Sequence, residues 1–272
     1  MPNTFKDLHA TERPLVLPNA WDVASARVIE DAGARAIATS SAGVAWSLGA
    51  PDGDRLDRER AVDLVARIVA AVRLPVSADI ESGFGETADD VAETVAIVRE
   101  AGAVGVNIED AHHGGPQPLR ETKRQAERLA AARQAGGDGL FLNARLDTYL
   151  LSVGDPADRF RETVERAAAY REAGADGIFV PGVYDAATIG SLAREIDAPL
   201  NVTGQPGAPT ITEMAELGVA RVSVGARIAQ AAYALARRSA RELLTAGTYD
   251  ELTDMLTFAE LNRLLNRLPS HR

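Results

Sequence analysis

The feature that most constrains the fold is a phrase that recurs four times along the chain. It consists of a charged, alanine-rich segment, a Gly and a short run rich in Val or Ile. The copies lie at 30–40 (EDAGARAIATS), 99–110 (REAGAVGVNIED), 171–182 (REAGADGIFVPG) and 215–226 (AELGVARVSVGA). The Gly stands where a helix ends in a left-handed residue, and the run after it is typical of a strand buried on both faces. Each copy therefore predicts a helix, a stop and a parallel strand.

Four further segments read as strands and bring the total to eight. They are 14–22 (PLVLPNAWD), 74–80 (LPVSADI), 139–147 (GLFLNARLD) and 198–204 (APLNVTG). Amphipathic helices are expected between strands, among them 56–72, 87–100, 156–172 and 210–217. Thr87 and Asp155 are the expected N-caps of two of these helices.

Eight parallel strands that alternate with helices over about 250 residues predict an α/β fold of the (β/α)8 TIM-barrel type. The alternative, a doubly wound sheet, usually has fewer strands and a glycine-rich phosphate turn after the first one. Here the first strand is followed by PNAWDVAS, which contains no GxGxxG. We therefore prefer the barrel.

The chain shows no linker or low-complexity stretch, so we expect a single domain over residues 1–272. Its last helical segments, 226–245 and 248–267, exceed one barrel helix and predict a C-terminal extension over about 226–272. Residues 251–265 carry apolar side chains that can cover a partner subunit. These side chains are Leu252, Met255, Leu256, Phe258 and Leu261. We expect a homo-oligomer.

Composition excludes several classes of partner and site. A net charge of −10 argues against binding to nucleic acid or to an anionic membrane. The absence of cysteine excludes disulfides, thiolate metal sites and a cysteine nucleophile. No secretory signal is visible, and no apolar run approaches the roughly 20 residues of a membrane span. We expect a cytoplasmic protein that acts on a small molecule.

Acidic side chains gather where the predicted strands end. In SADIESGFG (77–85), Asp79 and Glu81 lie two positions apart, so on an extended strand they face the same side, and Gly83 and Gly85 then let the backbone turn. Other strands end in TSSAG (39–43), NIEDAHH (107–113) and NARLD (143–147). The carboxyl ends of barrel strands converge on one mouth, where buried carboxylates would repel one another unless a cation lay between them. Oxygen ligands without cysteine favour Mg²⁺ or Mn²⁺.

At these residues the chain resembles the isocitrate lyase and phosphoenolpyruvate mutase superfamily. LPNAWDVASARV, TSSAG, SADIESGFG, VNIEDA, NARLD and ELGVARVSVG match the superfamily in order and spacing over roughly residues 14 to 230. The superfamily's (β/α)8 barrel agrees with the strand count. Its members make or break a bond at C3 of a pyruvate-like unit through a metal-stabilised enolate, and they commonly form tetramers in which paired subunits exchange a C-terminal helix.

The resemblance implies a role for individual residues. Asp79 would ligate Mg²⁺ directly, and metal-bound waters would be held by Asp52, Glu81 and Glu109. Ser41, with the amides of Ala42 and Gly43, would hold the substrate's carboxylate and oxo oxygen, and Arg145 would pair with the carboxylate or the enolate. Trp46 is a candidate wall of the pocket, and Asn201 is a candidate for substrate contact or for ordering the rim.

Two departures from the superfamily's lid motifs narrow the choice of reaction. The superfamily's isocitrate and methylisocitrate lyases carry a lid cysteine as proton donor, but the matching stretch here, AHHGGPQPLRETKRQ (111–125), has none. The mutases carry Glu-Asp-Lys and a lid asparagine, whereas here Ala111 follows Asp110 and no Asn occurs between 108 and 142. Oxaloacetate decarboxylation needs a chelated 2-oxo acid and an electrostatic sink for the enolate, but no dedicated lid acid.

We therefore rank a Mg²⁺-dependent, oxaloacetate decarboxylase-like lyase of a small 2-oxo dicarboxylate first. Retro-aldol cleavage of a 2-hydroxy acid such as methylisocitrate is second, and phosphonopyruvate carbon–phosphorus chemistry is third. Retro-aldol cleavage needs an acid and a base, for which His112, His113 or Tyr149 would have to serve. A 2-oxo acid-binding protein without turnover is the rival from another class.

Two further expectations concern the lid and its helix. The glycine- and proline-rich loop 111–125 should be open without ligand and order over a bound 2-oxo acid, with His113 as a candidate proton donor. Arg124, Arg128 and Arg133 are expected to form a solvated helix face.

Overall fold

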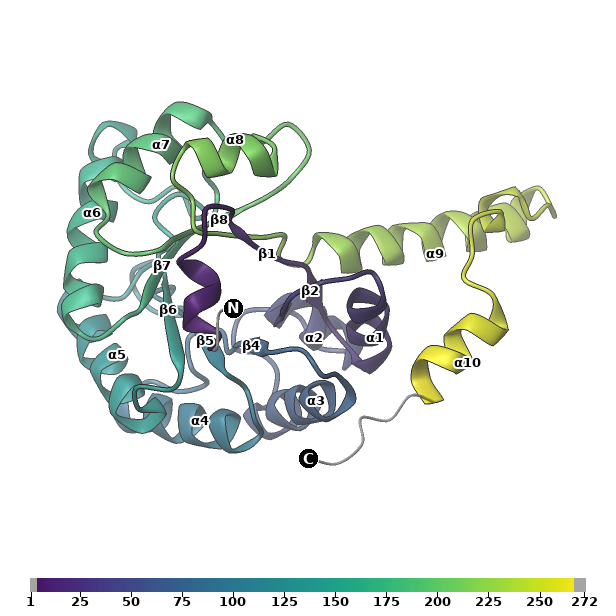
Figure 1. Cartoon of the computed structure of the whole chain (residues 1–272), viewed down its shortest axis with the longest axis horizontal. Coiled ribbons are helices and arrows are strands. Elements are labelled where there is room, and N and C mark those ends of the chain that lie inside the picture. Colours follow the sequence, from purple (N-terminus) through teal and green to yellow (C-terminus); the bar gives the residue numbers. More distant parts are fainter. Residues whose placement is uncertain (1–3, 267–272) are drawn as a thin grey trace.

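A parallel sheet forms the centre of the molecule and curls into a nearly closed barrel (Figure 1). The computed structural model describes residues 4–266. The strands are β1 (Leu15–Leu17), β2 (Asn19–Ala20), β3 (Ile37–Thr39), β4 (Val76–Asp79), β5 (Gly105–Glu109), β6 (Phe141–Arg145), β7 (Gly177–Val180), β8 (Leu200–Thr203) and β9 (Arg221–Ser223). Their order in the sheet is β1-β9-β8-β7-β6-β5-β4-β3-β2, with every pairing parallel. The predicted TIM-type α/β class is confirmed.

The predicted first strand is divided in two at Pro18, which gives nine strands where the sequence predicts eight. Leu15 of β1 pairs with Arg221 of β9, and Asn19 of β2 pairs with Ala38 of β3. Proline has no N–H, so a regular ladder cannot run through it. The two short pieces therefore pair with different neighbours, β1 with β9 and β2 with β3, and nearly close the barrel.

Helices surround the barrel (Figure 1). They are α1 (Val23–Asp31), α2 (Ser41–Ser47), α3 (Arg58–Ala71), α4 (Ala88–Glu100), α5 (Thr122–Gly136), α6 (Pro156–Glu172), α7 (Ala186–Glu195) and α8 (Ile211–Glu216). The predicted N-caps are confirmed: Thr87 Oγ1 accepts the Asp90 N–H at 3.1 Å, and Asp155 accepts the Ala157 N–H at 2.9 Å. No helix within residues 4–266 has the length and apolar character needed to cross a bilayer.

The core has an apolar outer layer and a polar interior. Between strands and helices, residues such as Val91, Leu129 and Ile178 are fully buried. Inside the barrel, Asn143 Nδ2 donates to Asn107 Oδ1 at 2.9 Å, and Arg221 Nη2 donates to the same oxygen at 3.2 Å. Because β5 and β9 are far apart in the sheet order, this contact crosses the barrel interior.

A short N-terminal helix, η1 (Lys6–His9), covers the end of the barrel at which the strands begin. The His9 ring stacks on Phe141, the first residue of β6, with centroids 3.9 Å apart, and Phe5 packs edge-on against the same ring. This end is closed by packing, so a substrate site belongs at the other end, where the strands finish.

The C-terminal segment forms an arm that leaves the barrel along α9 (Arg227–Thr245) and turns back through η2 (Asp250–Leu252) to α10 (Phe258–Asn266) (Figure 1). The predicted single helix over 248–267 is wrong for its described part, because residues 253–257 are not helical; residue 267 lies outside the described residues. The Glu242 carboxylate accepts the N–H groups of Asp250 and Glu251 and so fixes the turn after α9. Thr257 and Glu260 cap one another at the start of α10.

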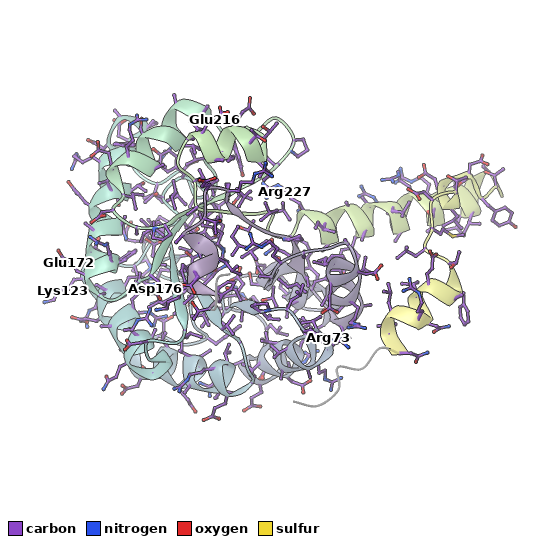
Figure 2. The ribbon with its side chains drawn as sticks, in the orientation of Figure 1. Arg73, Lys123, Glu172, Asp176, Glu216 and Arg227 are labelled. Carbon is purple, nitrogen blue, oxygen red and sulfur yellow. The ribbon has the colours of Figure 1, made fainter. Side chains whose placement is uncertain are left out.

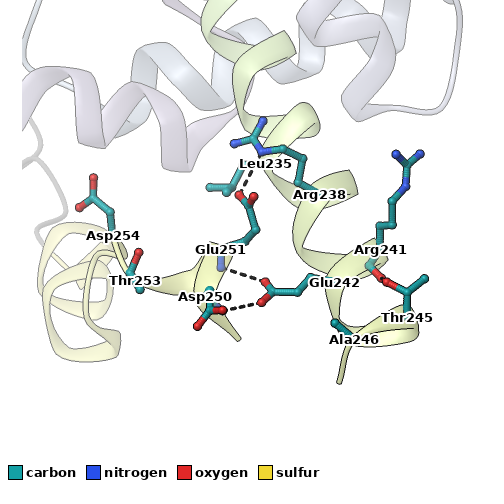
Figure 3. Close-up of a pocket in the computed structure, with 10 residues that line it drawn as sticks. All are labelled: Leu235, Arg238, Arg241, Glu242, Thr245, Ala246, Asp250, Glu251, Thr253 and Asp254. Carbon is teal, nitrogen blue, oxygen red and sulfur yellow. Dashed lines mark hydrogen bonds and ion pairs between the residues drawn. The ribbon is translucent and has the colours of Figure 1, made fainter. Parts of the chain in front are cut away.

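The arm returns to the barrel through α1. Arg27 Nε donates to the Leu264 carbonyl at 2.9 Å, and Leu264 is buried. Between α9 and η2 the arm has an open hollow of about 850 Å³ (Figure 3). Its lining contains none of the predicted site residues, so the site is sought elsewhere.

Candidate active site

A cavity of about 500 Å³ brings several of the predicted site residues together. Ser41 and Trp46 come from α2 after β3, and Asp52 comes from the loop that follows α2. Asp79 is the last residue of β4, and Arg145 is the last residue of β6. The convergence of these strand ends, expected from the sequence, is therefore present.

Asp52 and Asp79 are the two carboxylates that line this cavity. Burial raises the pKa of Asp79 to about 6, with Arg145 opposing the shift and Glu109 adding to it. Burial, followed by the charge of Glu109, also raises the pKa of Asp52, while Arg145 and the Ser41 hydroxyl oppose the shift. Both acids thus lie where a further positive charge would stabilise their ionised forms.

The structure corrects the reason for pairing Asp79 with Glu81. β4 ends at Asp79, and Glu81 has a φ of 51°, in the left-handed region, so the two do not alternate along one extended strand. The Glu81 carboxylate accepts the backbone N–H of Asp54 and is absent from the lining of the cavity. Burial, opposed by this hydrogen bond, raises the pKa of Glu81 to about 8.

Arg145 joins two buried acids at the floor of the site. Its Nη1 lies 2.6 Å from Glu109 Oε2, and its Nε donates to Asp147 Oδ1 at 2.7 Å. Burial raises the pKa of Asp147 to about 7, although Arg145 opposes this. The pKa of Glu109 is lowered, because Arg145 and His113 outweigh the effect of its burial. Arg145 is thus paired with both acids at once.

His113 lies in the loop after β5 and contacts Glu109, but it does not line the cavity of about 500 Å³. Its Nε2 lies 2.5 Å from Glu109 Oε1, and this hydrogen bond raises the pKa of His113. The loop is closed by an isolated antiparallel bridge between Ala111 and Leu119. His113 also lines a hollow of about 440 Å³ with Gly53 and Asp54, beside the Glu81 carboxylate. His112 faces Glu86 instead, at 3.4 Å. Opening and closing of this loop remains a prediction.

The other predicted substrate contacts fall into two groups. Ser41, Ala42 and Trp46 line the cavity. Gly43 and Asn201 do not: the Gly43 N–H donates to Ser40 Oγ at 3.3 Å, and Asn201 lies inside the barrel, where its amide donates to the Val202 and Arg221 carbonyls. Packing requires glycine at position 43, because a Cβ there would lie 2.7 Å from the Cβ of Trp21.

The prediction of a solvated arginine face on α5 is wrong at two of its three positions. The side chain of Arg124 is 75% exposed, as expected. Arg128 is instead buried and donates to the carbonyls of Ser82, Gly85 and Thr87. Arg133 donates to the Gly174 carbonyl and pairs with Asp176. A long guanidinium chain can leave its helix for a neighbouring loop, and helical periodicity does not reveal this.

The donor set fits Mg²⁺ held largely through water. Within residues 4–266, no three acidic or histidine side chains already surround one point as a ligand set. Asp79 and Asp52 reach the cavity, while Glu81 and Glu109 lie behind it with other partners. Mg²⁺ in proteins is usually held by one or two carboxylates and keeps several waters. One direct ligand with the other acids on bound water is consistent with this arrangement.

Comparison with known proteins gives the same superfamily. The family model described as phosphoenolpyruvate phosphomutase matches residues 5–244. An uncharacterised protein of Mycobacterium tuberculosis is 38% identical over 96% of each chain. A 2-methylisocitrate lyase of Aeropyrum pernix is 30% identical over 89% of this chain and 79% of its own. An oxaloacetate decarboxylase of Pseudomonas putida is 28% identical over 76% and 68%.

Solved structures agree with the sequence relatives. A protein of Burkholderia cenocepacia, provisionally named a lyase/mutase, superposes with a TM-score of 0.89 at 40% identity and covers 97% of this chain and 94% of its own. A phosphonopyruvate hydrolase in complex with oxalate and Mg²⁺ superposes with a TM-score of 0.83 at 25% identity over 95% and 92%. The chain belongs to the phosphoenolpyruvate phosphomutase family, within the isocitrate lyase and phosphoenolpyruvate mutase superfamily.

Proposed function

We propose that this protein is a Mg²⁺-dependent lyase that acts on a small 2-oxo dicarboxylate in the manner of an oxaloacetate decarboxylase. The observation that carries the proposal is the cavity that unites Ser41, Asp52, Asp79 and Arg145. Relatives named as 2-methylisocitrate lyase and oxaloacetate decarboxylase, and the Mg²⁺ and oxalate of the phosphonopyruvate hydrolase, support this chemistry.

In this proposal Asp79 would ligate Mg²⁺ directly, and Asp52, Glu81 and Glu109 would hold its bound waters. When bound, Mg²⁺ supplies polarisation of the 2-oxo group and offsets negative charge that develops during bond cleavage. Mn²⁺ would serve in the same way.

Residues of the chain itself would bind the substrate carboxylate, stabilise the enolate and donate a proton. Ser41, at the start of α2, lines the cavity with Asp52 and would present its hydroxyl to the substrate carboxylate. Arg145 is held by Glu109 and Asp147, so its guanidinium is fixed before substrate arrives and can stabilise an enolate oxygen. The Glu109 carboxylate favours the protonated form of His113, which suits a donor of a proton to C3.

Retro-aldol cleavage of a 2-hydroxy acid is the second candidate, and the position of His113 is the observation that favours it. Without a lid cysteine, such a reaction needs another acid for the departing carbanion. A decarboxylase does not, because solvent can protonate a pyruvate enolate. Carbon–phosphorus cleavage of phosphonopyruvate is third, and binding without turnover is the rival outside enzyme chemistry.

A screen of oxaloacetate, methylisocitrate, isocitrate and phosphonopyruvate with Mg²⁺, with detection of the 2-oxo acid product, tests this ranking. We expect the fastest turnover with oxaloacetate. Binding of these acids without turnover of any of them would instead support the non-catalytic alternative.

His113→Ala separates the two lyase reactions. We expect it to slow retro-aldol cleavage of a 2-hydroxy tricarboxylate by on the order of 100-fold, the usual contribution of a general acid, and to leave oxaloacetate decarboxylation largely intact. His112→Ala is the matched control, because His112 faces Glu86 rather than Glu109. Equal loss on both substrates would count against the decarboxylase preference.

A further inference from the structure

The cavity that holds Asp79 and Arg145 has a second arginine, Arg227, in its lining. Arg227 is the first residue of α9, and Figure 2 shows it where the arm leaves the barrel. Its guanidinium is held by Tyr184, from the loop after β7, and by Gln205, from the loop after β8. In the sheet order these two strands lie across the barrel from β3 and β4, which carry the Mg²⁺ side of the proposed site. The Arg227 guanidinium therefore faces the cavity from the side opposite the proposed Mg²⁺ site.

The hydrogen-bond partners of Arg227 are all neutral. Its Nη2 donates to Tyr184 Oη at 3.0 Å and to Gln205 Oε1 at 2.7 Å, and its Nη1 donates to the Val224 carbonyl at 3.2 Å. No ion pair involves it within residues 4–266, whereas Arg145 is already paired with Glu109 and Asp147. Neutral neighbours thus hold Arg227 in position, and no carboxylate of the described residues neutralises its positive charge.

Polar groups make up much of the cavity surface, but part of it is apolar. Phe179, Pro181 and Leu150 line it together with Tyr184. A ligand that fits this lining has a polar head at Asp79 and Arg145, a short hydrocarbon section against the apolar wall and a negative group at Arg227. A partly buried guanidinium without an anionic partner binds a carboxylate strongly.

We propose that Arg227 binds a second anionic group of the substrate, a carboxylate beyond C3, and thereby selects dianionic over monoanionic 2-oxo acids. This inference rests on the proposed function, because it assumes that a 2-oxo acid occupies the Asp79 end. Tyr184 and Gln205 act as positioning residues that hold the guanidinium toward the cavity.

The proposal sets a kinetic expectation for oxaloacetate. Its second carboxylate leaves as neutral CO₂, so a contact between that group and Arg227 stabilises the bound substrate and is lost in the transition state. Removing the charge should therefore raise KM for oxaloacetate and raise kcat with it, so that kcat/KM changes little.

The test compares ligands of matched chain length by calorimetry in the presence of Mg²⁺. 2-Oxoglutarate and 2-oxovalerate differ at their far end by a carboxylate, and oxalate reports on the Mg²⁺ end alone. We expect wild-type protein to bind 2-oxoglutarate on the order of 10- to 100-fold more tightly than 2-oxovalerate. In Arg227→Gln this preference should fall to within about 3-fold, with oxalate affinity unchanged.

Two further variants guard against a purely structural effect. Gln205→Glu leaves the arginine in place but puts a carboxylate at a position now 2.7 Å from it, and should abolish the preference in the same way. Arg237→Gln makes the same exchange as Arg227→Gln on an exposed position of α9 and should change nothing.

The outcomes separate this inference from the function on which it rests. If oxalate does not bind wild-type protein, the proposed function falls and this inference falls with it. If oxalate binds but the dicarboxylate preference is absent, or survives in Arg227→Gln, the role of Arg227 alone is overturned.

Discussion

Two carboxylates of the candidate site line the cavity and two lie behind it, a division that residue identity alone does not reveal. Asp52 and Asp79 line the cavity, while Glu81 is turned toward the Asp54 amide and Glu109 is bound by Arg145. Glu81, Glu109 and Asp79 are predicted from the sequence as strand-end acids, and Asp52 is implied by the family resemblance. Which of them reaches the cavity depends on backbone conformation and on partners that are distant in the chain.

Substitution at Asp79 and Glu81 tests this division. Asp79→Ala should abolish measurable Mg²⁺ binding, because a direct ligand has no substitute, whereas Glu81→Asp should weaken it by no more than about 10-fold, since water can bridge the shorter side chain. Titration calorimetry with MgCl₂ on both variants gives the comparison. Equal loss in the two would show that the inner ligand has been misassigned.

The loop after β4 shows how elements fix the site. Gly83 has a φ of 102°, and a Cβ at this position would lie 2.8 Å from Val91, so the turn requires glycine. Arg128 of α5 then binds the carbonyls of Ser82, Gly85 and Thr87 and ties the loop to the helix. The turn is visible in the sequence as SGFG, but the arginine that holds it is not.

Replacing Arg128 should therefore cost stability. Arg128→Met leaves the buried Ser82 carbonyl and the less buried Gly85 and Thr87 carbonyls without this donor, and we expect it to lower the free energy of unfolding by about 2–4 kcal/mol. Arg124→Met, on the same helix but exposed, should change it by no more than about 0.5 kcal/mol. Urea titration of both variants decides this, and similar values would mean that the Arg128 contacts carry little energy.

Strands, caps and the end of the barrel that bears the site were predictable, because helix-stop-strand junctions and capping residues act locally. The network around Arg145 was partly predictable, since β5 and β6 pair in a register that places Glu109 beside Arg145. Arg128 and Arg227 were not, because their long side chains reach loops far away in the sequence. The break at residues 253–257 was missed although Thr257 and Glu260 form a recognisable N-terminal capping pair.

At the scale of the whole molecule, the arm leaves large apolar side chains in solvent. Leu244 is 87% exposed and Phe258 is 85% exposed, with Tyr249 and Met255 also exposed between them. We propose that the chain is one barrel domain whose arm packs on a second copy. Burial of such side chains is worth about 1.5–3 kcal/mol each.

Light scattering at micromolar concentration should therefore show a dimer or a tetramer. Leu244→Asp should shift the population toward monomer, while Ile97→Asp, at an exposed apolar position on α4, should not. Wild-type protein that scatters as a monomer would refute the proposal.

Release of pyruvate from oxaloacetate, followed by a coupled dehydrogenase and corrected for the protein-free rate with the same Mg²⁺, tests the central claim most directly. We predict turnover that stops in EDTA, returns with Mg²⁺ or Mn²⁺ and is lost in Asp79→Ala. Full activity in EDTA, or a rate in Asp79→Ala equal to that of the wild type, would contradict the account.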